Sequence, residues 1–219
     1  MLEIALPIAL VAVAYLVGGI PIGVLVSDSR GVDIRKYGSG NIGASNVLRT
    51  LGVKAGLAVW LADVAKGLLP VLWLRPLLTS IATIGPMELW ISLVALAVVM
   101  GHCFSPYLKL AGGRGVSTSL GALLALDWRV GVLAFAVWVV VVAVSRYISL
   151  GSILAAVSGP LLFALYTDSP YYLAVGVVLA ILIIERHRHN IGRLMTGTER
   201  RIGQKAHRTT EQPSDESER

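Results

Sequence analysis

Glycine, hydroxyl, amide and guanidinium groups are concentrated in one polar segment, residues 38–52, between two long apolar stretches. Its glycines allow sharp backbone turns that expose N–H groups, as an oxyanion or a phosphate requires at close range. Ser45, Asn46 and Arg49 fall at helical spacing, so the guanidinium can lean back over the same ligand. We interpret the segment as an anion-handling loop; an ordinary polar connector is the alternative, because these residue types also mark turns. The candidate ligands are Ser39, Gly40, Asn41, Gly43, Ser45, Asn46 and Arg49.

A second glycine-rich segment, Gly112-Gly113-Arg114-Gly115, stands directly before a predicted helix that begins at Val116. Backbone N–H groups at a helix N-terminus carry about half a positive charge and bind phosphate. Arg114 adds a planar fork that suits phosphate oxygens. The spacing does not match a Walker A loop, which argues against nucleotide hydrolysis. The alternative is a flexible turn between helices, with Arg114 extended to the lipid headgroups.

A third polar group begins where the last apolar stretch ends. His187 and Asn190 are three residues apart, which places them on one helical face and lets both act on one substrate. His189 points elsewhere. The alternative is a cytoplasmic helix end with incidental histidines, which is also the simplest explanation for the neighbouring charges, Glu185, Arg186, Arg188 and Arg193.

Asp63 and Lys66 lie within an apolar stretch, where ionisable groups are costly unless they are paired or hydrated. They either pair and brace the helices, which we favour, or line a polar cavity. His102, at the end of another apolar stretch, is also more simply structural. We find no metal-ligand spacing and no Ser-His-Asp or Cys-His pattern, and we expect neither a metal nor a cofactor.

The composition is that of an integral membrane protein. Hydrophobic residues make up 55% of the 219-residue chain, the mean hydropathy is +0.74, and only 15% of residues are charged, against about 25% in soluble domains. The net charge of +6 is better explained by membrane orientation and phosphate attraction than by nucleic-acid binding. The single cysteine, Cys103, excludes an intrachain disulfide.

Seven apolar stretches predict an all-α protein with seven transmembrane helices: 4–26, 53–74 (ended by Arg75 and Pro76), a third from Leu77 or Met87 to Phe104, 116–126, 130–144, 148–166 and 171–184. The fourth gives only about 21 Å of helix, against a hydrocarbon core of about 30 Å. Either it is half of a recessed pair or its start lies below the headgroups. We favour the second, which shelters residues 112–115.

An odd number of spans puts the termini on opposite sides of the membrane. The polar loops share one side, and only Lys66, Arg75 and Arg129 of the 19 Lys and Arg lie away from it. The positive-inside rule therefore predicts an outside N-terminus and a cytoplasmic C-terminus. Residues 1–203 are predicted to form one membrane domain, and 204–219 a disordered polar cytoplasmic tail.

The three motifs together resemble the bacterial acyl-phosphate-dependent glycerol-3-phosphate acyltransferases, the PlsY family. The resemblance rests on 38–49, on Gly101-His102 with 112–116, and on 187–191 with 197–199, and it covers nearly the whole chain, from Ile4 to Gly203. The chain departs from the family pattern at three positions: Arg114 replaces a lysine, Ser45 a threonine and Ile42 a proline. Arg114 keeps the charge but changes its reach and geometry.

The resemblance implies a seven-span enzyme of the bacterial inner membrane with a cytoplasmic active site. It moves a fatty acyl group from acyl phosphate to the 1-hydroxyl of glycerol 3-phosphate, which gives lysophosphatidic acid. Ser39, Arg49 and Arg114 hold the phosphates, and His187 and Asn190 contact glycerol 3-phosphate, with Ser152 nearby. Membrane lipid and an upstream acyl-phosphate-forming enzyme are the implied partners; the oligomeric state stays open.

No carboxylate stands beside the motifs as an obvious base. The family is thought to let the substrate's own phosphate assist deprotonation, so His187 is either an orienting group or a general base. From the residues alone, two other functions stay open. One is a small transporter of an anionic metabolite, and the other is a scaffold whose loops bind headgroups.

Overall fold

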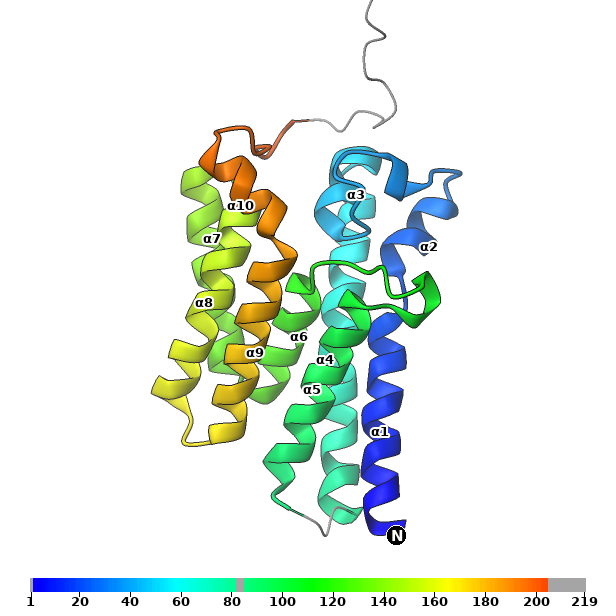
Figure 1. The fold of residues 1–219 in the computed structure, drawn as a ribbon, viewed down its shortest axis with the longest axis vertical. Coiled ribbons are helices and arrows are strands. Elements are labelled where there is room, and N and C mark those ends of the chain that lie inside the picture. Colours follow the sequence, from blue (N-terminus) through cyan, green and yellow to red (C-terminus); the bar gives the residue numbers. More distant parts are fainter. Residues whose placement is uncertain (1, 82–84, 205–219) are drawn as a thin grey trace, which may run out of the picture.

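The computed structural model describes residues 2–81 and 85–204, and its regular elements are helices that run along one axis (Figure 1). In chain order they are α1 (Leu2–Gly19), α2 (Ile22–Asp28), η1 (Ile34–Lys36), α3 (Ala44–Leu51), α4 (Val53–Ile81), α5 (Met87–Cys103), η2 (Pro106–Leu108), α6 (Val116–Leu126), α7 (Trp128–Ser145), α8 (Ile148–Tyr166), α9 (Pro170–Arg186) and α10 (Arg188–Met195). The predicted tail, 204–219, lies outside the described residues except for Gln204.

Five helical segments are long and apolar enough to cross a membrane: Ala5–Asp28, Val53–Thr79, Met87–Leu108, Trp128–Ser145 and Ile148–Tyr166. The α9–α10 pair adds a sixth if its 60° bend falls within one span, and α6 is a shorter apolar helix of 11 residues. The expected all-helical membrane protein is thereby confirmed. The number of seven crossings stays a prediction.

The second span is longer than its sequence suggests. Helix α4 continues through Arg75 and Pro76 to Ile81, so the predicted end at these two residues is wrong. A proline removes one backbone donor, and neighbouring helices make such a loss tolerable inside a bundle. The Arg75 guanidinium stays within the bundle, 3.5 Å from the Leu126 carbonyl and 3.2 Å from the Tyr172 hydroxyl.

The first span is interrupted between α1 and α2 at Pro21, which has no N–H to donate. Two carbonyls near this break accept from side chains of other helices or loops. The Ser105 hydroxyl donates to Gly19 O over 2.6 Å, and the Lys66 ammonium donates to Ile20 O over 2.8 Å. Lys66 is therefore held by the break in the first span as well as by its own helix.

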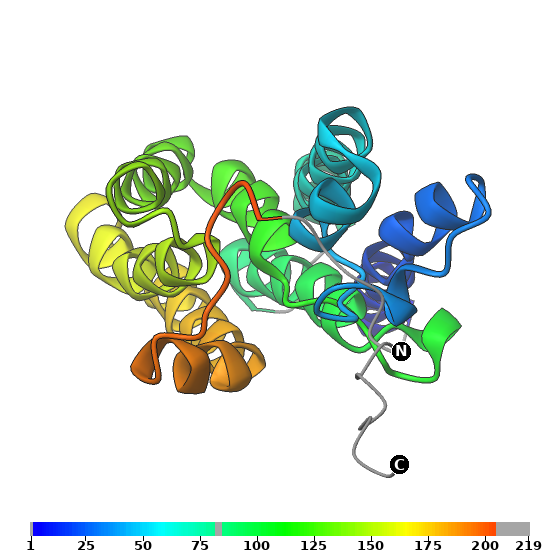
Figure 2. The same cartoon turned by 90° about the horizontal axis from the view of Figure 1, so that it is seen from above.

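The apolar core centres on α5 and α6. Val94, Val98 and Val99 of α5 and Ala122 of α6 are fully buried. Helix α6 packs against α4, α5, α7, α8 and α9, and the view from above shows it between the α1 and α4 side and the α7 to α9 side (Figure 2). This central helix starts immediately after the second glycine-rich segment, so the core fixes where that segment lies.

Helices α4 and α6 approach each other backbone to backbone. A Cβ on Gly67 would lie 2.1 Å from the Thr118 carbonyl oxygen, and one on Gly121 would lie 2.1 Å from that of Val64. Small residues permit such close approach between membrane helices. The contact brings the first turn of α6 beside the part of α4 that carries Asp63.

Candidate active site

A cavity of about 640 Å³ opens at the end of the bundle where α3, α10 and the polar loops gather (Figure 1). It unites residues from all three sequence motifs. The predicted site residues that line it are Ser39, Asn41, Gly43, Ser45, Arg49, Arg114, Gly115, Ser152, His187 and Asn190. The predicted residues outside the lining are Gly40, Asn46, Gly112 and Gly113.

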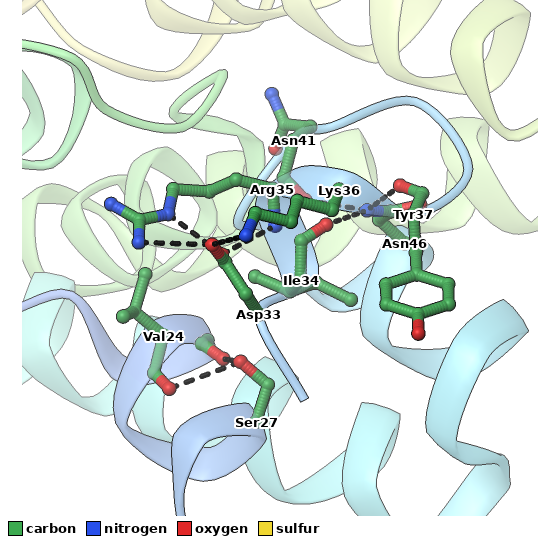
Figure 3. Close-up of polar contacts among 10 residues, drawn as sticks. Val24, Ser27, Asp33, Ile34, Arg35, Lys36, Tyr37, Asn41 and Asn46 are labelled. Atoms are coloured by element: carbon green, nitrogen blue, oxygen red, sulfur yellow. Dashed lines mark hydrogen bonds and ion pairs between the residues drawn. The ribbon is translucent and has the colours of Figure 1, made fainter. Parts of the chain in front are cut away.

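Asn46 supports the first loop from beneath instead of facing the cavity. Its side chain is fully buried, and its Nδ2 donates to the carbonyl oxygens of Tyr37 and Asn41, each over 2.9 Å, and to that of Ile34 over 3.3 Å. Its Oδ1 accepts from the Ser39 N–H over 3.1 Å. Figure 3 shows the Asn46 amide beside Ile34, Tyr37 and Asn41. Its bonding capacity is used within the loop, which differs from the expected ligand role.

Arg49 and Arg114 line the same cavity, as the sequence predicts, and Arg193 and Arg200 line it as well. Arg49 donates to the Arg200 carbonyl over 3.4 Å, while its Nε is buried without a hydrogen-bond partner among the described residues. Burial lowers the pKa of Arg49, and it lowers the pKa of Arg114 to about 10. Both groups stay cationic at neutral pH. Because they are partly removed from water, they attract an anion more strongly than exposed arginines do.

His187 lies at the 60° bend between α9 and α10, not within one continuous helix. Its Nδ1 lies 2.8 Å from the Ile183 carbonyl oxygen. A carbonyl only accepts, so Nδ1 carries the hydrogen, and in the neutral ring Nε2 is left to accept one. The ring is 2% exposed and lines the cavity. This tautomer suits an incoming hydroxyl donor.

Glu199 was not expected among the site residues, but it lines the cavity. Its Oε1 accepts from the Ser149 hydroxyl over 2.8 Å and from Asn190 Nδ2 over 2.6 Å, and its Oε2 accepts from Arg193 Nε over 2.7 Å. Burial alone raises the pKa of this carboxyl, but the three hydrogen bonds bring the pKa below its ordinary value. Glu199 is thus an ionised anchor for its neighbours.

One side-chain atom of Asn190 is left without a hydrogen-bond partner. Asn190 donates through Nδ2 to Glu199, and its buried Oδ1 has no partner among the described residues. A buried amide oxygen without a donor is costly in a finished structure. A hydroxyl group of a bound substrate is the kind of donor that satisfies it.

Three ionisable residues of the membrane-spanning helices, Asp63, Lys66 and His102, form one group beside the cavity. Lys66 Nζ lies 2.8 Å from Asp63 Oδ1, and His102 Nδ1 lies 3.6 Å from the same oxygen. Asp63 and His102 also line the cavity. The two interpretations of Asp63 and Lys66 therefore hold together, since the pair braces α4 and its carboxylate borders the cavity.

Aromatic residues of α4 and α7 form an apolar part of the cavity lining, which we call the apolar arm. It consists of Trp60, Phe135 and Trp138. The ring centroids of Trp60 and Phe135 lie 5.9 Å apart, and those of Phe135 and Trp138 lie 5.8 Å apart. The same three residues also border a second cavity of about 50 Å³, together with Leu123 and other small or aliphatic side chains. A cavity that combines cationic and apolar lining suits an amphiphilic anion.

Comparison with known proteins agrees with this chemistry. A family model for glycerol-3-phosphate acyltransferase matches residues 8–197. The chain is 46% identical over 193 residues to the glycerol-3-phosphate acyltransferase of Geobacter sulfurreducens, in an alignment that covers 88% of this chain and 96% of that protein. It is 48% identical over 194 residues to that of Desulforamulus reducens, covering 88% and 93% of the two chains.

The fold matches two crystal structures of PlsY, an integral membrane glycerol 3-phosphate acyltransferase. Its glycerol 3-phosphate form gives a TM-score of 0.83 at 38% identity, and its lysophosphatidic acid form gives 0.81 at 37% identity. Each match covers 90% of this chain and 96% of the other. The similarity thus extends over sequence, fold and the segments that line the cavity. The chain belongs to the glycerol-3-phosphate acyltransferase family.

Proposed function

We propose that the chain transfers a fatty acyl group from acyl phosphate to the 1-hydroxyl of glycerol 3-phosphate. The hydroxyl oxygen bonds to the acyl carbon, the bond from that carbon to the phosphate oxygen breaks, and lysophosphatidic acid and phosphate leave. The observation that carries the proposal is one cavity lined both by the partly buried guanidinium groups of Arg49 and Arg114 and by the apolar arm. Membership of the family supplies the reaction class.

The main task of such an enzyme is to bring two anions together. Acyl phosphate is already activated, because phosphate is a good leaving group, so positioning and charge screening are the larger contributions. Arg49 and Arg114 offset the repulsion between the two phosphates. The hydroxyls of Ser39, Ser45 and Ser152 line the same space and can donate to phosphate oxygens. The acyl chain occupies the arm beside Trp60 and Phe135.

His187 and Asn190 orient the attacking hydroxyl in this proposal, and the leaving phosphate takes its proton. The ring Nδ1 of His187 is hydrogen-bonded to a backbone carbonyl. Among the described residues no carboxylate bonds that ring to stabilise the imidazolium that a general base becomes. If His187 is an orienting group, His187→Gln keeps measurable turnover and loses no acid limb in its pH profile. Complete loss in both His187→Gln and His187→Asn would instead assign it as the base.

The topology we propose has seven crossings, with the N-terminus outside and the C-terminus cytoplasmic in the bacterial inner membrane. Three observations support it. The start of α1 and the segment after α10 lie at opposite ends of the bundle (Figure 1). Helix α6 is apolar, and the Lys and Arg residues concentrate at the end that carries the cavity. Accessibility of single cysteines introduced at Gly31 and Asp168 to an impermeant reagent in whole cells tests the orientation.

The decisive assay measures phosphate release and lysophosphatidic acid formation by the purified protein with acyl phosphate and glycerol 3-phosphate. We expect both products in equal amounts, and neither product when glycerol 3-phosphate is omitted. Acyl thioesters, supplied in parallel, are expected to give none. A transporter or a scaffold forms no product with any donor, and turnover with thioesters but not with acyl phosphate would overturn the proposed donor.

A further inference from the structure

Arg186, the last residue of α9, donates hydrogen bonds to the second glycine-rich segment, residues 112–115. Its Nε donates to the Gly113 carbonyl oxygen over 3.0 Å, and one terminal nitrogen donates over 2.8 Å to each of the carbonyl oxygens of Gly112 and Gly113. The guanidinium also lies over the Phe104 ring, 5.4 Å from its centroid. Hydrogen bonds from a charged donor are about twice as strong as neutral ones. Nothing in the sequence pattern separates Arg186 from the other charges at this helix end.

The same segment is held from its other side by the end of α5. The Gly113 N–H donates to the His102 carbonyl oxygen over 3.0 Å. A Cβ on Gly112 would lie 2.2 Å from that oxygen, and one on Gly113 would lie 2.1 Å from His102 Nε2. Both positions therefore require glycine for close packing. Gly112 and Gly113 form a clamped strip between α5 and Arg186, in which both carbonyl oxygens and the Gly113 N–H are hydrogen-bonded to these neighbours.

We propose that Arg186 is a positioning residue for the phosphate site: by clamping Gly112 and Gly113 it directs Arg114, the next residue, into the cavity. The inference rests on the proposed role of Arg114 in binding phosphate. Arg114 lines the cavity, whereas Arg186, Gly112 and Gly113 do not. Arg186 thus acts through Arg114 and not by touching a substrate.

The clamp depends on the shape of a guanidinium. Its planar fork reaches two consecutive carbonyl oxygens at once, whereas a lysine ammonium is a compact donor on a flexible stem. Docking of α9 does not need this contact, because Val175, Leu179 and Ile183 of the same helix are buried in the bundle. A substitution at Arg186 is therefore expected to release the strip while the helix stays in place.

The test is a double-mutant cycle on the full-length protein in detergent, with acyl phosphate and glycerol 3-phosphate as substrates. Arg186→Gln and Arg186→Lys are each made alone and combined with Arg114→Ala. We expect each single change at Arg186 to lower kcat/KM by about tenfold or more, chiefly through a higher KM. In the Arg114→Ala background the same change is expected to alter kcat/KM by less than about twofold, because the residue it positions is gone.

Arg188→Gln is the matched control. Arg188 is two residues away, exposed and paired with Glu185, so its loss is expected to leave kinetics at the wild-type level. Gly113→Ala is a second route to the same lesion, since its methyl group displaces the strip from His102. It is expected to reproduce the KM effect and the lack of additivity, and it decides the question if the Arg186 variants do not fold.

Each outcome separates this inference from the function on which it rests. Wild-type kinetics in Arg114→Ala contradict the phosphate role of Arg114 and overturn both. An impaired Arg114→Ala with an unimpaired Arg186→Gln overturns only the positioning role. The positioning role also fails if the effects of the two changes multiply in the double variant, because a merely structural contact is independent of Arg114. Full rescue by Arg186→Lys contradicts the forked clamp.

Discussion

The two glycine-rich loops have similar compositions but are supported in opposite ways. The first, residues 38–43, is held by the side-chain amide of Asn46, which is close to it in the sequence. This amide bonds the backbone of Ser39, seven positions away, and of Asn41, five positions away. The second, residues 112–115, is held from outside by Arg186, more than 70 positions away in the sequence. A self-supported loop can present several of its own residues to a cavity. The clamped one presents Arg114 and Gly115.

This difference teaches that a glycine-rich segment does not by itself identify a phosphate cradle. In the second loop the carbonyls of Gly112 and Gly113 accept from Arg186, and the Gly113 N–H bonds to α5. The groups of this loop that still line the cavity are the Arg114 side chain and Gly115, directly before α6. In the first loop, Ser39, Asn41 and Gly43 all line the cavity. The comparison predicts different responses to substitution.

The largest expected effect tests the single cation of the clamped loop. Arg114→Ala is expected to lower kcat/KM by about 100-fold or more, the scale for removing a preorganised group that stabilises developing charge. Arg114→Lys is expected to retain activity within about tenfold, because it keeps the charge but not the fork. Steady-state phosphate release measures both. Equal losses in the two variants would mean that the fork, and not the charge, is what matters.

Asn46→Ala breaks the internal support of the first loop. It leaves three carbonyls and one N–H without their partner, and each buried group left unsatisfied costs about 1–3 kcal/mol. We expect a lower Tm in detergent together with a fall in kcat/KM of about tenfold. Ser29→Ala, which removes an exposed hydroxyl near the same end, serves as the control. An unchanged Tm would show that the loop does not depend on this amide.

Glu199 gives the supporting network a dependence on pH that neither loop has. Its pKa is lower in the folded protein than the ordinary 4.5, so its contribution to stability is complete above pH 4.5 and is lost as the pH falls through the lower, folded pKa. Glu199→Gln removes that pH dependence and weakens the hydrogen bonds to Asn190 and Arg193. We expect its activity to be a few-fold lower than that of the wild type. Tm measured in wild type and Glu199→Gln from neutral pH downwards checks this. Parallel curves would contradict it.

Gly40→Ala is expected to have the smallest effect. Gly40 has φ +67 and no cavity contact, and a Cβ there meets only the Arg35 carbonyl oxygen at 3.1 Å. Left-handed backbone costs a residue with a Cβ about 1–2 kcal/mol. We therefore expect a modest decrease in Tm and a change in kcat/KM of about twofold. A loss as large as that of Gly113→Ala would erase the contrast between a strained position and a clamped one.

The local pattern predicted the helices better than it predicted the site's support. The bounds predicted for α6 and α8 are those observed, because apolar runs with flanking turn residues carry that information. The end predicted for α4 at Pro76 was wrong, because the helix continues to Ile81. Neighbouring helices can compensate the backbone hydrogen bond that a proline removes, and the local sequence does not show which helices will be neighbours. The three motifs were rightly expected to meet, because their residue types share one chemistry.

What the sequence could not reveal is which polar groups are already used. The residue type and position of Asn46 predict a phosphate-binding group. Its hydrogen-bond partners are instead backbone atoms that only the folded loop brings within reach. Glu199 and Ser149 are 50 positions apart, and Arg186 and Gly113 are 73 positions apart. No periodicity connects such pairs. The Gly197-Thr198-Glu199 run was part of the family resemblance, and it was the one available signal for Glu199.

The segment after α10 also has a practical consequence for handling the protein. It crosses the upper face seen in Figure 2, contributes Thr198, Glu199 and Arg200 to the cavity wall, and is fastened by Ile202, whose N–H donates to the Arg146 carbonyl oxygen over 2.9 Å. Shortening the chain to Met195 thus deletes part of the cavity wall. Affinity tags, protease sites and fusion partners belong beyond Gln204.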